Sequence, residues 1–366
     1  MHSIARVMAM FAAWKLRKKY LLILPALCCI LVAVVCSFFQ SSTAAVNAAP
    51  ESSQEKDYIK WVDFTVPETL LKTALDIDLS TYGSEDSPHV DWIDLLAYLS
   101  AKYGGDFSRY HRKDLDSAVE QVKAGESISE LAADMKYFGY YREAYDAVLG
   151  GLVGEFEVET EQGWEQQYGL KGCSPIAYTF PYSDYDDFGA GRSYGYRRKH
   201  LGHDMMAQVG TPVVAVESGV VEALGWNQYG GWRIGIRSFD GKRYHYYAHL
   251  RQNRPYAEGL EVGQTVMAGD VIGYVGRTGY SLTENTNNIN VSHLHYGLQL
   301  IFDESQKEGN NEIWIDVYAL CNFLRRHQSA VQRNDETKEW SAVRKQREEI
   351  PDDCFVPSEQ VPEEAS

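Results

Sequence analysis

The chain has 366 residues, of which 45% are hydrophobic and 23% are charged, as is typical of a globular protein long enough for two domains. Its formal net charge of −16 makes it a poor partner for nucleic acid or anionic lipid. We therefore expect no binding to nucleic acid, and we expect recognition to depend on a small set of residues.

The first fifty residues differ from the rest, because they include basic residues but no acidic ones. Residues 1–19 form a basic, cytoplasmic segment, and the uncharged residues 20–39 are enough to cross a hydrocarbon core of roughly 30 Å as a transmembrane helix. Since basic residues stay on the cytoplasmic side, we expect a single-pass cell-membrane protein whose remaining residues are extracellular. A signal peptide cleaved near Val46-Asn47-Ala48 is the alternative and would give a secreted protein.

Residues 40–56 are rich in small and polar residues and predict a linker. Residues 57–160 then predict a small all-α domain, because apolar residues recur at helical spacing in four segments. Representative pairs are Leu95 and Leu99, Leu115 and Val119, Leu131 and Met135, and Tyr141 and Val148. Ser127 and Glu130 have the spacing of a capping box at the start of the third helix. We interpret this domain as a spacer, with sugar stacking by its aromatic residues as the alternative.

Residues 165–325 predict a mainly antiparallel β-sheet domain, because the hydrophobic period changes to two from about Tyr182. Asp240-Gly241 between two such segments is a strong hairpin signal. Residues 326–366 are charged and lack apolar periodicity, so we expect a disordered tail with a short helix around residues 340–348. The fold class is therefore α+β multidomain.

The cysteine pattern excludes a disulfide framework. Outside the apolar N-terminal run only Cys173, Cys321 and Cys354 remain, an odd number that cannot all pair within one chain. One bridge could form, and its pairing is left open. No Cys-x-x-Cys motif occurs, so cysteine metal ligands are not expected.

Histidines and an aspartate are concentrated in three motifs. They are His200-Leu201-Gly202-His203-Asp204, Tyr247-Ala248-His249-Leu250 and His293-Leu294-His295. Two imidazoles and a carboxylate from distant stretches are the ligands that an open catalytic zinc site needs. They leave a fourth position for water, whose pKa the metal lowers toward about 7. Spare histidines can move protons or stabilise an oxyanion, so the pattern predicts a zinc hydrolase.

Strand periodicity predicts how some of these side chains point. His293 and His295 are two apart in a strand-like segment, so both should project from one face. By the same parity His245, Tyr247 and His249 should share a face, with His249 the better catalytic candidate because it ends the strand. The spacing of His200 and Asp204 suits a loop running into a strand. Neither spacing nor periodicity says which atoms bind the metal.

Together these motifs resemble the lysostaphin and LytM type of bacterial cell-wall zinc metalloendopeptidases. The resemblance covers residues 180–302, including glycine-rich stretches between the histidine motifs. It implies one bound zinc ion and hydrolysis of an amide bond in the peptide stems or cross-bridges of peptidoglycan. It also implies roles for five residues, with His200, Asp204 and His295 as zinc ligands and His249 and His293 as catalytic residues.

Within this resemblance we expect His293 to act as general base and His249 to donate to the oxyanion, and the two roles could be exchanged. His203 stands where the family usually has an apolar residue, and it should point to the opposite strand face as a structural residue. The asparagine-rich residues 280–292 are longer than the family's usual link and should form a loop at the groove rim. The cleaved bond and the oligomeric state are left open. A non-catalytic scaffold protein of the cell envelope with the same fold is the alternative function.

Overall fold

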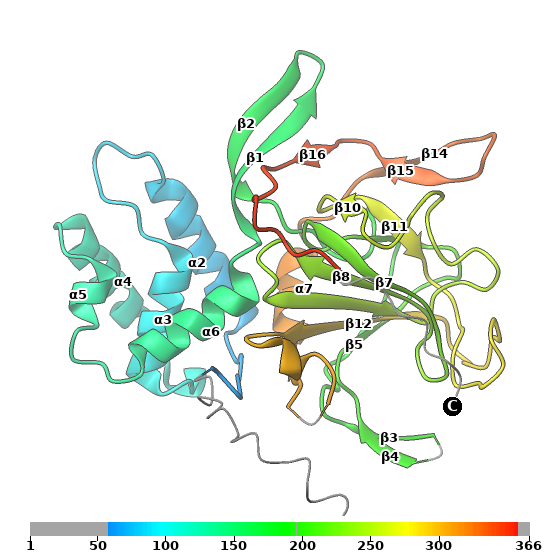
Figure 1. The fold of residues 1–366 in the computed structure, drawn as a ribbon. Helices are drawn as coiled ribbons and strands as arrows, with labels where there is room; N and C mark the ends of the chain where they lie inside the picture. Colours follow the sequence, from blue (N-terminus) through cyan, green and yellow to red (C-terminus); the bar gives the residue numbers. More distant parts are fainter. Residues whose placement is uncertain (1–57, 195, 310, 358–366) are drawn as a thin grey trace, which may run out of the picture. The chain divides into compact units, whose positions relative to one another are not determined.

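The structure is a computed structural model that describes residues 58–194, 196–309 and 311–357 (Figure 1). The predicted membrane-spanning segment at residues 20–39 and the predicted linker at residues 40–56 lie outside these ranges, so both stay predictions. Within the described ranges, no helix has the length and apolar character needed to cross a membrane.

The helical region contains the predicted amphipathic helices and one more. Its α-helices are α2 (Glu68–Thr81), α3 (Trp92–Tyr103), α4 (Arg112–Lys123), α5 (Ile128–Leu131) and α6 (Phe138–Leu149), with a 3-10 turn η1 (Phe107–Arg109) between α3 and α4. The apolar residues predicted for α3, α4 and α6 are buried in the core, except Tyr141, which is partly buried against it. Helix α2 is the additional helix, which was not predicted. Its Leu71, Ala74 and Leu75 are buried at helical spacing.

Local capping explains where two of these helices start and end. The Ser127 hydroxyl accepts a hydrogen bond from the backbone N–H of Glu130, and the Glu130 carboxylate accepts one from the N–H of Ser127, which confirms the capping box. Helix α5 nevertheless ends at Leu131 and does not continue through Met135. Gly104 ends α3 with a positive φ of 64°, a conformation that glycine adopts without steric cost.

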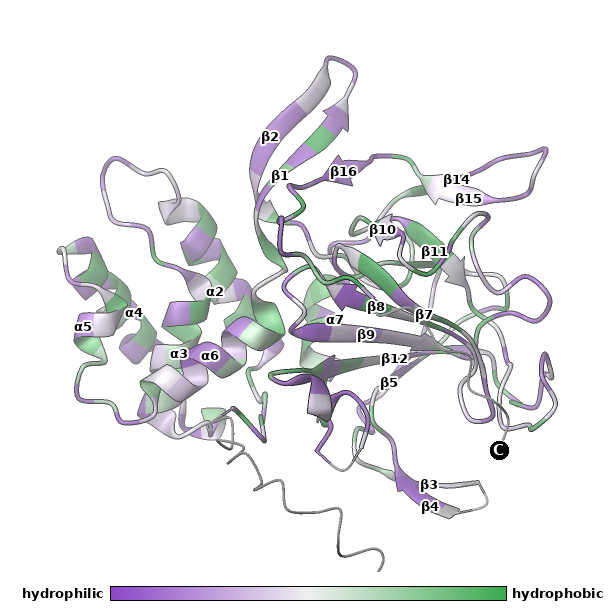
Figure 2. Ribbon diagram, viewed as in Figure 1, coloured by the Kyte–Doolittle hydropathy of each residue, from purple (hydrophilic) through white to green (hydrophobic). Residues whose placement is uncertain are grey.

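The predicted helical domain extends too far, because strands begin before residue 160. Strand β1 (Val153–Thr160) pairs with β2 (Gly163–Leu170) as an antiparallel hairpin, and β16 (Gln346–Arg347) adds a third strand beside β1. Figure 2 shows this hairpin to be largely hydrophilic, and the first residues of β2 are exposed. Strand β2 therefore lacks the alternating apolar pattern by which sequence marks a strand, whereas β1 shows it only over a short stretch, with Phe156 and Val158 between glutamates.

The C-terminal tail also differs from its prediction. It contains two further strands that pair as an antiparallel hairpin, β14 (Val331–Arg333) and β15 (Trp340–Ala342). The expected disorder of residues 326–366 is thus wrong for this part, and so is the expected helix at residues 340–348. The Trp340 ring packs edge-on against the Phe180 ring, with centroids 5.2 Å apart. Contacts with the sheet domain order a segment whose own composition is too polar to form a core.

A seven-stranded antiparallel sheet confirms the predicted β domain (Figure 1). Its strands in spatial order are β10 (Thr265–Val266), β7 (Gly219–Asn227), β8 (Gly231–Ser238), β9 (Arg243–Ala248), β12 (His293–Leu300) and β13 (Ile313–Ile315), and β5 (His203–Met206) also pairs with β12. The predicted turn at Asp240-Gly241 joins β8 to β9. The remaining elements are the pair β6 (Pro212–Val214) and β11 (Val271–Tyr274), the hairpin β3 (Gly191–Tyr194) and β4 (Tyr196–Lys199), the 3-10 turn η2 (Glu304–Gln306) and helix α7 (Tyr318–Leu324).

The two faces of this sheet carry different side chains. On β9, Tyr247 is fully buried in the hydrophobic core, whereas Tyr244 and Tyr246 line a groove on the other face. Successive residues of a strand point to opposite faces, so one face of the sheet can be the core while the other holds the site. The thiols of Cys173, Cys321 and Cys354 are free.

A buried ion pair fixes β9 to its surroundings on the core side. Arg243 and Glu217 are almost fully buried and form two hydrogen bonds of 2.8 and 3.0 Å, and His245 lies 2.9 Å from the same carboxylate. Arg243 also donates to Asp240 and to two backbone carbonyls at the C-terminal end of α6. Burial raises the pKa of Glu217, but the charge of Arg243 and the hydrogen bond from His245 outweigh burial and lower it to about 2.

We predict that Glu217→Gln destabilises the protein by about 3–5 kcal/mol at pH 7, because it leaves Arg243 buried without its main counter-ion. The folded-state pKa of Glu217, about 2, lies below its ordinary value of 4.5. Its stabilising contribution is therefore complete above about pH 4.5 and is lost as the pH falls toward 2.

Urea unfolding of the wild type and Glu217→Gln at several pH values would measure this difference. The difference should shrink below pH 4.5, because Glu217 then takes up a proton in the unfolded wild type while it stays ionised in the folded protein down to about pH 2. Glu258→Gln, at an exposed position, is the matched control and should change the free energy of unfolding by less than about 0.5 kcal/mol. Equal stability of Glu217→Gln and the wild type at pH 7 would contradict the prediction.

Candidate functional site

A groove of about 470 Å³ lies on the polar face of the sheet and contains most of the predicted site. His200, Asp204, His249 and His295 line it. The His293 ring is adjacent, with its centroid 4.8 Å from that of His249. The structure thus brings together all five residues that the sequence singled out, although they come from three motifs far apart in the chain.

Strand pairing places Asp204 beside His295. In the antiparallel pairing of β5 with β12, these two residues are direct partners, so their side chains leave the sheet on the same face. The Asp204 Oδ1 atom lies 2.9 Å from His295 Nδ1. His200, in the loop just before β5, adds its Nε2 atom at 3.0 Å from both of these atoms. A loop running into a strand was the expected setting for His200 and Asp204.

The geometry of these three donor atoms fits a zinc ion. Zinc bonds to nitrogen and oxygen measure about 2.0–2.1 Å, which separates neighbouring ligands of a tetrahedral site by about 3.3 Å. The distances among His200 Nε2, Asp204 Oδ1 and His295 Nδ1 are 2.9–3.0 Å. Three acceptor atoms of this kind repel one another unless a cation or proton lies between them. The donor set, two imidazoles and one carboxylate, is that of an open zinc site.

Gly202 leaves the space that the His295 ring occupies. A Cβ atom at this position would lie 2.6 Å from His295 Cε1 and 2.7 Å from the backbone oxygen of Tyr296. Neither atom can move away freely, because both belong to β12. Any larger residue at position 202 would therefore displace the ring from the cluster.

Asp187 and Arg192 support the cluster from outside, and neither belongs to a predicted motif. Asp187 Oδ1 lies 2.9 Å from His200 Nδ1, so this nitrogen carries the hydrogen and Nε2 keeps its lone pair for a metal. Arg192 donates to Asp187 and, at 3.0 Å, to Asp204 Oδ2. The other oxygen of Asp204, Oδ1, is thereby left to face His200 and His295. Hydrogen bonds between separate loops leave no periodic pattern in the sequence. Only the three aspartates within residues 184–187 could have drawn attention to this segment.

Electrostatics favour the metal-binding form of two of the three donors. Burial raises the pKa of Asp204, but hydrogen bonds from His200 and His295 outweigh burial and lower it far below its usual range. Burial lowers the pKa of His295. Burial also disfavours a charged His200, but the Asp204 and Asp187 carboxylates outweigh burial and raise its pKa. A metal ion therefore competes with a proton for His200 as the pH falls.

His249 reaches the groove in a way that strand parity does not predict. Parity would place it on the core face with His245 and Tyr247, but strand β9 ends at Ala248 and His249 has a positive φ of 61°. This left-handed turn redirects the side chain to the groove face. Its Nδ1 lies 2.9 Å from the backbone oxygen of Thr278. Because a carbonyl only accepts, Nδ1 carries the hydrogen and Nε2 has the lone pair.

His293 has the same arrangement of its ring nitrogens. Its Nδ1 donates to the backbone oxygen of Val291 at 2.8 Å, and its Nε2 lies 3.8 Å from Asp204 Oδ1. Burial and the neighbouring charges of His293 and His295 lower the pKa of His249 well below its ordinary value, so His249 is neutral at neutral pH. Two imidazoles therefore flank the cluster, each with Nε2 available for chemistry.

The two remaining histidines of the motifs are structural. His203 Nε2 lies 2.9 Å from Asp184 Oδ2, and His245 lies between Glu217 and the Tyr296 hydroxyl on the core face. Both side chains are buried. The opposite strand face was the expected position of His203, whereas His245 was expected to share a face with His249. The predicted loop at residues 280–292 begins at the groove, since Tyr280 lines it.

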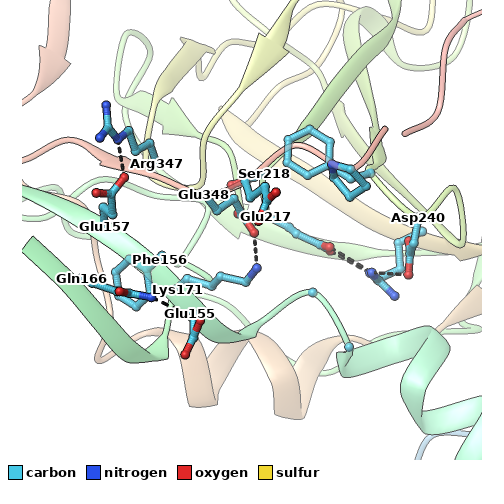
Figure 3. A pocket seen from close by; sticks show the side chains of 16 residues that line it. Glu155, Phe156, Glu157, Gln166, Lys171, Glu217, Ser218, Asp240, Arg347 and Glu348 are labelled. Carbon is cyan, nitrogen blue, oxygen red and sulfur yellow. Dashed lines mark hydrogen bonds and ion pairs between the residues drawn. The ribbon is translucent and has the colours of Figure 1, made fainter. Parts of the chain in front are cut away.

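A second cavity, of about 540 Å³, contains none of the predicted site residues (Figure 3). Its lining is rich in charged side chains from the β1–β2 hairpin, the sheet and the C-terminal tail. Their charges are paired with one another, through Lys171 with Glu348 and Arg347 with Glu157. The cavity therefore offers few unsatisfied groups to a ligand.

Comparison with known proteins agrees with this geometry. The model of peptidase family M23 matches residues 198–308. The L-Ala–D-Glu endopeptidase of Bacillus subtilis is 44% identical over 165 residues, which are 44% of this chain and 47% of that protein. The glycyl-glycine endopeptidase ALE-1 of Staphylococcus capitis is 38% identical over 98 residues, 26% of this chain and 24% of that protein. The chain thus spans less than half the length of either relative.

A solved structure also resembles part of the chain. The catalytic domain of the antimicrobial peptidase lysostaphin from Staphylococcus simulans is 30% identical, with a TM-score of 0.31, and the match covers 38% of this chain and 92% of that one. The matched segment of the family model begins two residues before His200 and includes all five site residues. Residues 198–308 of this chain are therefore a peptidase family M23 domain, homologous to L-Ala–D-Glu endopeptidase and lysostaphin.

Proposed function

We propose that the chain is a zinc metalloendopeptidase that hydrolyses amide bonds in the peptides of bacterial peptidoglycan. The observation that carries this proposal is the convergence of three donor atoms within 3.0 Å of one another at the base of an open groove. The names of the related peptidases supply the substrate class. They refer to two different bonds, an L-Ala–D-Glu bond and a glycyl-glycine bond, so kinship alone does not choose between stem and cross-bridge.

In this proposal His200, Asp204 and His295 hold the zinc ion. When bound, zinc supplies Lewis-acid polarisation of the scissile carbonyl and increases the acidity of water. His249 accepts the proton that water loses as its oxygen bonds to the carbonyl carbon, and the proton then moves to the departing amine as the C–N bond breaks. His293 donates a hydrogen bond to the oxygen on which negative charge develops.

This division of roles reverses the preference that the sequence suggested. A general base must be unprotonated, and burial lowers the pKa of His249 so that it stays neutral. An oxyanion donor must carry a hydrogen on the nitrogen that faces the substrate. His293 Nδ1 already donates its hydrogen to the Val291 carbonyl, so His293 acts as this donor with a hydrogen on both ring nitrogens, and its side chain is only partly buried.

We also propose that residues 20–39 anchor the chain in the cell membrane with the peptidase domain outside, on the grounds of their sequence alone. This location would place the site beside its polymeric substrate.

The five site residues should separate into two groups on substitution. Asp204→Ala and His295→Ala should lose bound zinc, because each removes a ligand. His249→Ala and His293→Ala should keep the metal but lower turnover of peptidoglycan by about 100- to 10,000-fold, the usual contribution of a proton-transferring group. Elemental analysis of the purified variants, together with product release from peptidoglycan, measures both properties.

His203→Asn serves as a comparison for these variants, because His203 faces the other side of β5 and should keep both zinc and the groove geometry. Metal loss in the His249 or His293 variants would overturn the division of roles. Zinc in the wild type without any hydrolysis would favour the scaffold function.

Asp187 should control metal affinity without touching the metal. Asp187→Asn removes the charge that orients His200, and we predict a zinc affinity lower by about 10- to 100-fold. Competitive zinc titration with a chelator measures this affinity. Asp186→Asn is a matched control, because Asp186 is the exposed neighbour in the same loop. Equal losses of affinity in the two variants would mean that Asp187 has no specific role.

The membrane location can be tested by cell fractionation. The full-length chain should stay in the membrane fraction after high-salt washing, and deletion of residues 1–39 should release it, because no described helix could hold it there. If expression of the full-length chain instead releases into the medium a protein shorter by about 48 residues, the cleaved signal peptide is supported.

A further inference from the structure

Two arginines in the groove have no acidic partner. Arg198 on β4 and Arg233 on β8 both line the groove beside the metal site. Among the described residues no carboxylate forms an ion pair with either of them, and the Nε atom of each is buried without a hydrogen-bond partner. Two other arginines of the sheet, Arg237 and Arg243, each pair with a glutamate. A buried N–H without a partner costs free energy that a ligand can recover.

The Arg198 guanidinium is held in a fixed orientation. It lies over the Tyr229 ring, 5.1 Å from the centroid, and over the Tyr280 ring, 4.9 Å from the centroid. It also donates a hydrogen bond to the Tyr280 hydroxyl. Aromatic rings against the planar faces leave the N–H groups of the edges to bind a ligand, and those edges match a carboxylate with two parallel hydrogen bonds.

Tyr246 links these arginines to the metal site. Its ring centroid is 6.0 Å from that of His295. Tyr246 lines the same groove as Arg198 and Arg233, and their positive charges oppose the rise in its pKa that burial causes. A substrate whose scissile amide is at His295 would therefore place its adjacent residue near the arginines.

Two other cations of the groove, Lys307 and Arg192, already have acidic partners. Lys307 lies 3.3 Å from Glu222, and Arg192 is bound to Asp204. Two acidic residues, Glu308 and Glu312, line the groove away from the cluster. The Glu312 carboxylate accepts a hydrogen bond from the Trp314 indole at 2.7 Å. Lys199 also lines the groove but is exposed to solvent, so the part-buried cations without an acidic partner among the described residues of the groove are Arg198 and Arg233.

We propose that Arg198 and Arg233 form a carboxylate-binding subsite, which selects peptides that carry a free carboxylate next to the scissile amide over neutral glycine chains. The inference rests on the proposed function and narrows it to an acidic stem peptide. A glycine bridge offers no charged group that could pair with these two part-buried guanidinium ions, so their Nε atoms would stay buried without a partner when it binds.

The test compares three synthetic peptides with the zinc-loaded wild type. The first is a stem peptide with the free carboxylate, the second has a carboxamide at the same position, and the third is pentaglycine. The carboxamide has nearly the same shape but no charge. We expect KM for the carboxylate peptide to be about 10- to 100-fold lower than for the carboxamide peptide, as charge-assisted hydrogen bonds would give.

Substitutions at the arginines should remove this discrimination. Arg198→Met and Arg233→Met should raise KM for the carboxylate peptide by about 10- to 100-fold, so that it approaches KM for the carboxamide peptide in the same variant. Arg198→Lys and Arg233→Lys should restore part of the preference, because the charge remains. Arg197→Met is the matched control, since Arg197 is the exposed neighbour on β4 and does not line the groove.

Calorimetric binding of the same peptides gives a readout that does not need hydrolysis, and circular dichroism with zinc content verifies that each variant is folded. Equal binding and equal KM for the carboxylate and carboxamide peptides would overturn the inference, and so would faster cleavage of pentaglycine. These results leave the proposed function intact if hydrolysis occurs. Absence of any hydrolysis, with selective binding of the carboxylate peptide, would instead retain the subsite and refute the proposed function.

Discussion

The antiparallel pairing of β12 with two different strands is the constraint on which the site depends. His295 lies directly between Asp204 of β5 on one side and Ala248 of β9 on the other. One strand thus aligns three motifs that are separated by tens of residues in sequence. Because register fixes the face on which each side chain lies, a slip of one residue would turn His295 into the core and dissolve the cluster.

The β3–β4 hairpin contributes to both parts of the groove. Arg192 on β3 binds Asp187 and Asp204, and so stabilises the carboxylates around the donor cluster. Arg198 on β4 lies between tyrosine rings at the position that we assign to the substrate carboxylate. One short hairpin therefore connects the support of the metal ligands with the recognition of the substrate, while the rigid sheet below provides the base.

Much of the site could be predicted from sequence because strands have a period of two. That period correctly placed His293 and His295 together and His203 on the opposite face. It failed for His249, since one residue with a positive φ changes the direction of a side chain and leaves no trace in hydrophobicity. Asp187 was missed because its contact with His200 joins two loops on either side of the β3–β4 hairpin. The fold was predictable where several long segments alternate, and it was missed in the polar strands β2 and β16 and in β1, where the alternation is short.

The three-stranded sheet formed by β1, β2 and β16 joins parts of the chain that are far apart, since Glu157 is paired with Arg347. A two-stranded hairpin is marginal in water, so the third strand matters for its stability. During synthesis on the ribosome β16 can join this hairpin only after the whole peptidase domain has been made. Its completion is therefore a late folding event with a large loop-closure entropy, and a nascent chain stopped before residue 346 would leave the edge of β1 uncovered.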